Sequence, residues 1–123
     1  MRRTLLLLFF SSVYLFSSAH TREIILTPNG QIPNREGLPL CYDMPTAYYF
    51  YDNKTQDIII DGNGVVSYYD VEISSPVTNT VEMTTQVNGT YDSFDISSLA
   101  AGPHVITIES PSGNIYEGSF TTY

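Results

Sequence analysis

The stretch "SSLAAGPHVITIES", residues 97–110, shows the pattern that decides the fold of this sequence. Gly102-Pro103 is a turn signal, and after it His104 and two isoleucines alternate with valine, threonine and glutamate up to Glu109. Strict alternation of this kind is typical of a β-strand with one buried and one exposed face. We therefore predict a strand over residues 104–109 whose buried side carries His104, Ile106 and Ile108.

Similar short segments, rich in Ile, Val, Thr and Tyr, recur between turn dipeptides along the chain. No window carries the apolar stripe that an amphipathic helix would need. Period-two patterning with frequent turns favours an antiparallel β-sandwich or barrel, so we predict an all-β protein. The candidate strands are residues 23–27, 46–52, 57–60, 66–74, 80–87, 92–96, 104–109 and 115–122.

Residues 1–19 have the order of a cleaved secretory signal peptide. Arg2 and Arg3 form a basic start, an apolar region runs from Leu5 to Phe16, and small residues end at Ala19. As a helix, the apolar region would reach only about 18 Å, which is short of the roughly 30 Å hydrocarbon core of a bilayer. We therefore expect a secreted or periplasmic protein, with no membrane insertion after cleavage.

The rest of the chain has the size of one small domain, which we place over residues 20–123. Four prolines fall within residues 28–45, too densely for a central strand, because proline donates no hydrogen bond to a sheet. We predict that residues 20–45 form an N-terminal strand and a Pro-rich irregular connection. Residues 46–123 would then form the main body of the β-sandwich.

The charge of the chain is strongly acidic. It has 5 basic and 13 acidic residues, a net charge of −8, and the loss of Arg2 and Arg3 would make it more negative. Such a surface repels phosphate backbones and anionic lipid headgroups. We expect no nucleic-acid partner.

No motif of the sequence points to catalysis. Cys41 is the one cysteine, so no intrachain disulfide can form. Its surroundings, "LPLCYDMP", lack a Gly-rich or helix-N-terminal setting that would lower the thiol pKa, which favours a structural cysteine. There is no Gly-x-Ser-x-Gly elbow and no recognisable acid/base pair of carboxylates. We expect a protein that is not an enzyme and has no cofactor.

Two groups of residues have metal-ligand chemistry. Asp57, Asp61 and Asn63 resemble the oxygen ligands of a calcium loop, but the downstream Glu is missing and Asp-Gly-Asn-Gly suits a hairpin turn, which we favour. His20 would become the N-terminal residue after cleavage, and its amine and imidazole could chelate copper, with His104 completing the site. The inward position of His104 favours a core role. We predict no metal site and keep copper chelation by His20 as an alternative.

The candidate binding residues are tyrosines. Tyrosine combines an apolar ring face with a polar edge, which suits stacking against sugar rings, although sheets also favour tyrosine as a filling residue. In any register Tyr48 and Phe50 point away from Tyr49 and Tyr51. We expect protein or glycan binding through a tyrosine-bearing sheet face, with the candidates Tyr48, Tyr49, Tyr51 and Tyr68.

The segment "FDISSLAAGPHVITIESPSGNIYEGSF", residues 94–120, resembles small secreted immunoglobulin-like domains of Bacteroidetes. These domains are classified together as a family of unknown function. With "QDIIIDGNG" and "VVSYYDVEI" upstream, the resemblance covers about residues 23–123. It implies an immunoglobulin-like antiparallel β-sandwich of seven or eight strands, similar to fibronectin-like sandwiches. It also implies that His104 replaces the tyrosine corner of such domains. The matching residues are Leu99, Gly102, His104, Ile106, Ile108, Gly113, Tyr116, Gly118 and Phe120.

The resemblance implies a secreted, non-catalytic module with a structural role or a protein or glycan partner in the cell envelope. A C-terminal-type sorting domain for type IX secretion is the alternative, because those domains share the Leu…Gly-x-Tyr…Ile pattern. However, the sequence ends "GSFTTY", without the basic residues that usually close such tails. Only a signal peptide and a loop-rich segment precede the sandwich, whereas a sorting domain follows a cargo. We therefore favour the binding or structural module.

Overall fold

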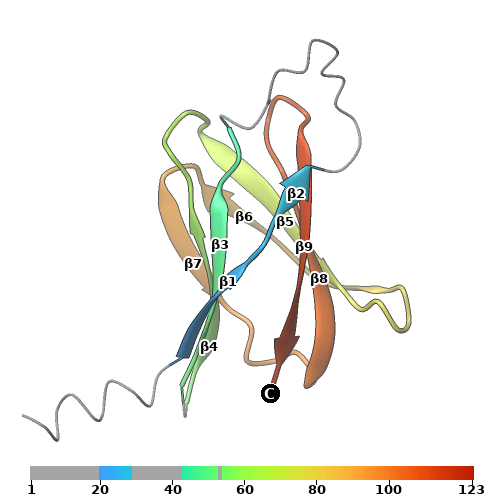
Figure 1. Cartoon of the computed structure of the whole chain (residues 1–123). Coiled ribbons are helices and arrows are strands. Elements are labelled where there is room, and N and C mark those ends of the chain that lie inside the picture. The colour runs from blue at the N-terminus through green and yellow to red at the C-terminus, as the bar shows by residue number, and fades with distance from the viewer. Residues whose placement is uncertain (1–19, 29–42, 53) are drawn as a thin grey trace, which may run out of the picture.

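Nine β-strands make up the described part of the chain (Figure 1). The structure is a computed structural model, and it describes residues 20–28, 43–52 and 54–123. The predicted signal peptide, most of the Pro-rich connection and Cys41 lie outside the described residues. The strands are β1 (His20–Ile24), β2 (Thr27–Pro28), β3 (Thr46–Tyr51), β4 (Gln56–Asp61), β5 (Tyr68–Ser74), β6 (Val81–Asn88), β7 (Tyr91–Asp95), β8 (Gly102–Glu109) and β9 (Ile115–Thr122).

The strands form two antiparallel sheets that pack face to face, as Figure 1 shows. One sheet has the order β1-β3-β4-β7 and the other has the order β2-β9-β8-β5-β6. The predicted all-β antiparallel sandwich is confirmed. Nowhere in the described ranges is there a helix with the length and apolar character that crossing a bilayer would require.

The strand count differs from the predicted seven or eight at a single place. Seven of the predicted ranges each correspond to one strand, but the range 23–27 covers two strands, β1 and β2, which belong to different sheets. Ile24 and Leu26 are buried on either side of Ile25, which is 66% exposed. Alternation of buried and exposed residues continues through the crossing, so the pattern alone cannot distinguish one strand from two.

The crossing between the sheets depends on a glycine of β9. A Cβ atom at Gly118 would lie 2.6 Å from the backbone oxygen of Ile25 and 2.8 Å from Cγ2 of Ile24. Real Cβ atoms do not approach backbone this closely, so the N-terminal segment can lie against β9 only where a side chain is absent. Gly118 therefore fixes the path of the chain from β1 to β2.

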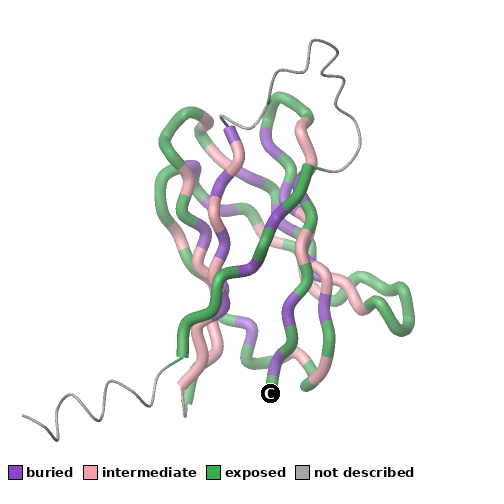
Figure 2. Tube along the Cα trace, viewed as in Figure 1, coloured by how far each residue is buried: buried purple, intermediate pink, exposed green. Residues whose placement is uncertain are grey.

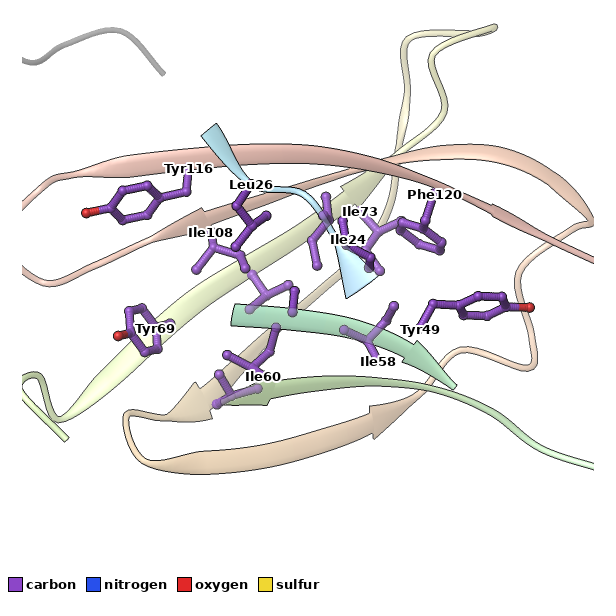
Figure 3. Close-up of a cluster of buried hydrophobic side chains, with 14 of the residues drawn as sticks. Ile24, Leu26, Tyr49, Ile58, Ile60, Tyr69, Ile73, Ile108, Tyr116 and Phe120 are labelled. Atoms are coloured by element: carbon purple, nitrogen blue, oxygen red, sulfur yellow. The ribbon is translucent and has the colours of Figure 1, made fainter. Parts of the chain in front are cut away.

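The core lies between the two sheets. Side chains from both layers meet between the sheets (Figure 3), and buried residues alternate with exposed ones along the strands (Figure 2). Ile106 and Ile108 of β8 are fully buried. The inward faces expected for these strands are therefore observed. The buried apolar residues are Ile24, Leu26, Ala47, Tyr49, Ile58, Ile60, Tyr69, Val71, Ile73, Val87, Ile96, Ile106, Ile108, Tyr116 and Phe120.

One end of the sandwich is closed by a buried carboxylate. The hydroxyl of Tyr69 donates to the backbone oxygen of Asp43 at 2.9 Å, and the hydroxyl of Tyr116 donates to the Asp43 carboxylate. Ser112 Oγ and Asn114 Nδ2 each donate to Oδ2 of Asp43 at 2.9 Å. These bonds hold the segment before β3 to β5 and to the β8–β9 hairpin. In Figure 3 the hydroxyls of Tyr69 and Tyr116 point to this end.

Hydrogen bonds keep the Asp43 carboxylate ionised despite its burial. Burial raises the pKa of this carboxyl, but the hydrogen bonds from Tyr116, Asn114 and Ser112 lower the pKa by more, so it lies below its ordinary value of 3.8. A carboxylate with a lowered pKa stabilises the fold above its unfolded pKa. That stabilisation is lost as the pH falls through the pKa of the folded state.

We expect Gly118→Ala to lower the free energy of unfolding by about 1–3 kcal/mol, because the new methyl group forces the crossing away from β9. Chemical denaturation measures this change. Ser119→Ala, at the next and exposed position of the same strand, is the matched control and should stay within about 0.5 kcal/mol of the parent. Equal stability of the two variants would show that the crossing does not need a glycine.

We expect Asp43→Asn to lower the free energy of unfolding by about 1–3 kcal/mol at pH 7, because buried hydroxyl and amide donors lose a charged acceptor. The difference between parent and variant should shrink as the pH falls below 3.8, where the parent carboxylate also becomes protonated. Denaturant titrations between pH 2 and pH 7 measure it, with the exposed Asp61→Asn as control. A difference that does not change with pH would show that the charge of Asp43 does not stabilise the fold.

Candidate functional site

The N-terminal strand places two side chains at the end of the sandwich opposite to Asp43. β1 runs antiparallel to β3 with His20 opposite Tyr51 and Arg22 opposite Tyr49. Residues directly opposite each other in such a pair point to the same face of the sheet. Tyr49 is a buried core residue whose hydroxyl points away from the Asp43 end (Figure 3). His20, Arg22 and Tyr51 therefore also lie on the inner face of their sheet.

A cleft opens at this end, and we call it the aromatic cleft. Its volume is about 360 Å³, and a neighbouring hollow of about 310 Å³ between β1 and β9 shares three of its residues. Tyr123, the residue after β9, brings its ring to the cleft from the second sheet. Concave sites of this size are typical of small-ligand binding. The residues that line the cleft are His20, Arg22, Tyr49, Tyr51 and Tyr123.

Tyr51 is at the centre of the cleft's aromatic rings. Its ring centroid lies 5.9 Å from that of His20, 6.3 Å from that of Tyr49 and 5.6 Å from that of Tyr123. The rings of His20 and Tyr49 stack on Tyr51, whereas the ring of Tyr123 is tilted by 54°. Tyr123 is 58% exposed, so part of this cluster remains open to solvent.

The floor of the cleft is part of the hydrophobic core. Tyr49 is only 3% exposed, and its hydroxyl donates to Oε1 of Gln56 at 2.8 Å. Burial raises the pKa of this hydroxyl, so it stays neutral at physiological pH. The ring of Tyr49 also packs against Phe120, with 5.8 Å between the ring centroids. These contacts hold the floor rigidly.

His104 supports the same floor from the other sheet. Its ring stacks on Phe120 at 5.4 Å, and its Nδ1–H donates to Oε1 of Glu82 at 2.7 Å. Nε2 lies 2.9 Å from the backbone oxygen of Ala100 and 3.1 Å from Oγ1 of Thr122. This contact with a carbonyl four residues upstream corresponds to the one that a corner tyrosine makes. His104 thus joins β6, the turn before β8, and β9.

Arg22 is the cation of the cleft. Its guanidinium lies 5.9 Å from the centroid of the Tyr123 ring, which is within the range of a cation–π interaction. Among the residues that the structure describes, the one contact within ion-pair distance joins His104 and Glu82, so Arg22 has no carboxylate partner there. The cleft therefore combines ring faces with a positive charge.

The four candidate tyrosines do not lie on one sheet face. Tyr49 and Tyr51 point inward and line the aromatic cleft. Tyr49 is buried and forms the floor of the cleft, so its side chain is not exposed to a ligand in solution. Tyr48 points to the outer face of the same sheet, in register with Ile59. Tyr68 precedes the buried Tyr69 on β5, so it points to the outer face of the other sheet.

Sequence reasoning missed two residues of the cleft and gave a third another role. The sequence pattern does not indicate Arg22 or Tyr123 as binding residues, and it suggests His20 only as a copper ligand. The signal for Arg22 was available in the composition, because it is one of few cations in an acidic chain. The approach of Tyr123 to Tyr51 joins positions far apart in the sequence, and no local pattern reveals it.

The residues considered as metal ligands lie apart. Both ring nitrogens of His104 are engaged by Glu82, Ala100 and Thr122, while His20 stacks on Tyr51. Asp57 and Asp61 lie at opposite ends of β4. Asn63 Oδ1 accepts from the backbone N–H of Val65, as in a turn. No group of three or more His, Cys, Asp or Glu side chains within the described ranges could hold a metal ion.

We expect His104→Tyr to keep the fold and to change the free energy of unfolding by less than about 1.5 kcal/mol, because a tyrosine hydroxyl can bond to Ala100 as in other sandwiches. His104→Ala removes the polar contacts and leaves a cavity, so it should cost about 3 kcal/mol. Thermal unfolding of both variants measures the difference. A tyrosine variant as unstable as the alanine variant would contradict the corner role.

Comparison with known proteins supports the fold. No family model matches the sequence, and no curated protein matches it. A crystal structure of a DUF3244 family protein with an immunoglobulin-like β-sandwich fold, from Bacteroides vulgatus, is similar to this chain. Its TM-score is 0.61 at 11% sequence identity, over 85% of this chain and 100% of that chain. The chain therefore has an immunoglobulin-like β-sandwich fold, and the resemblance to immunoglobulin-like domains of Bacteroidetes is confirmed at the level of the fold.

Proposed function

We propose that this chain is a secreted, non-catalytic immunoglobulin-like module of the cell envelope that binds a glycan in the aromatic cleft. The observation that carries the proposal is the placement of the Tyr51 and Tyr123 rings around a concave site. A pyranose ring has an apolar C–H face, which stacks on a tyrosine ring while the sugar hydroxyls bond to polar groups at the rim. The fold itself supplies no function, so the proposal rests on the site.

The rigidity of the floor favours binding. Tyr49 is held by Gln56 and by Phe120, and Phe120 is held in turn by His104. A ligand that binds to a preorganised surface loses less free energy to the ordering of side chains. Tyr51 therefore stacks against a ligand from a position that the core already fixes.

The outer face of the same sheet is a less suitable site. Tyr48 and Phe50 are half-buried there, and the surface around them is acidic. Burial, together with the negative charges of Asp95 and Asp52, raises the pKa of Asp57. The carboxylates on this face are those of Glu23, Asp57, Asp61 and Asp95. The aromatic cleft, in contrast, has no carboxylate side chain among its lining residues.

We expect the purified chain to bind members of an array of bacterial and host glycans, and Tyr51→Ala to weaken the best of these interactions at least tenfold. The loss of a stacking ring is the physical reason. Isothermal titration measures the affinity, and Tyr123→Ala serves as a second variant because that side chain is largely exposed.

Tyr68→Ala, on the outer face of the other sheet, is the matched control and should bind like the parent. Circular dichroism and thermal unfolding verify that each variant is folded. The absence of any binding on the array, or equal binding by the Tyr51 and Tyr68 variants, would show that the aromatic cleft is not a glycan site.

A further inference from the structure

Arg22 stands out in the aromatic cleft because no described residue uses its hydrogen-bonding capacity. The chain has 13 acidic and 5 basic residues, yet among the described residues none accepts a hydrogen bond or an ion pair from the Arg22 guanidinium. Glu23, its neighbour on β1, lies opposite Tyr48 and points to the other face of the sheet. A cation in a cleft that none of the described residues pairs is available to a ligand.

The surroundings hold the guanidinium at the mouth of the cleft. It lies over the ring of Tyr123, and Arg22 lines both the cleft and the neighbouring hollow. The planar fork of N–H donors on arginine matches the two oxygens of a carboxylate, and this charge-assisted pairing is stronger than a neutral hydrogen bond. Arg22 is thus placed to bind an anionic group beside the stacking face of Tyr51.

We propose that the ligand of the aromatic cleft is a glycan containing a hexuronic acid, whose carboxylate pairs with Arg22 while its sugar ring stacks on Tyr51. This inference rests on the proposed glycan-binding function. The net charge of −8 favours a ligand with one negative charge per sugar, because a phosphate dianion or a densely sulfated chain meets greater repulsion from the rest of the protein. A single carboxylate has the smallest negative charge that can form an ion pair with Arg22.

The test compares hexuronate oligosaccharides, of glucuronate and of galacturonate, with their methyl esters. Esterification keeps the sugar ring and removes the charge of the carboxylate. Isothermal titration of the full chain should show at least tenfold tighter binding of an acid form than of its ester. The preference should weaken with added salt, because an exposed charge pair is screened.

Arg22→Gln should weaken the binding of the acid form at least tenfold, to the level of the ester, and should leave the binding of the ester unchanged. Lys54→Gln is the matched control, because it removes one positive charge in the β3–β4 turn without touching the cleft. It should change the affinity less than twofold. Arg22 is exposed on β1, so its substitution is compatible with the fold.

Three results would overturn the inference. If acid and ester bind equally and Arg22→Gln changes neither, the ligand is a neutral glycan and the proposed function stands without the carboxylate. If no oligosaccharide of the panel binds and the glycan array is also negative, the proposed function falls with it. If a peptide with a free C-terminal carboxylate binds more tightly than every hexuronate, the cleft recognises proteins instead.

Discussion

The close approach of the N-terminal segment to Gly118 is the constraint on which the rest of the molecule depends. Because β9 carries no side chain at this position, the chain can pass from the edge of one sheet to the edge of the other. Ile24 and Leu26 enter the core on either side of the crossing. β1 is thereby aligned along β3, and this alignment places Arg22 beside the tyrosines of the cleft.

The two ends of the sandwich use their tyrosines differently. At one end the hydroxyls of Tyr69 and Tyr116 donate hydrogen bonds to Asp43, and these polar contacts close the structure. At the other end Tyr51 and Tyr123 keep ring surface at the wall of a cleft, above a floor that is continuous with the core. The sandwich therefore has one closed, polar end and one open, aromatic end, and the proposed binding site lies at the open end.

The sequence predicted the local features of this fold and missed the features that depend on distant contacts. Alternation placed Ile106 and Ile108 in the core, and the turn signals separated the strands, because both are properties of neighbouring residues. The sequence pattern did not show that residues 23–27 belong to two strands, because buried and exposed residues alternate without a break through Ile25. β1 pairs with β3 across the Pro-rich connection, and Tyr123 approaches Tyr51 from the far end of the described chain. Composition therefore indicated tyrosines as candidates but could not show which of them lie together.

Mapping of a hexuronate oligosaccharide on the isotopically labelled chain by NMR is the most direct test of the account. Backbone amide shifts should change most at Arg22, Tyr51 and Tyr123, with the Arg22 side-chain resonance among the most affected. The amide shifts of the residues that form the floor of the cleft should change little, because the hydrophobic core fixes their positions. Shifts centred on Tyr48 and Phe50, on the outer face of the sheet, would contradict the assignment of the aromatic cleft as the binding site.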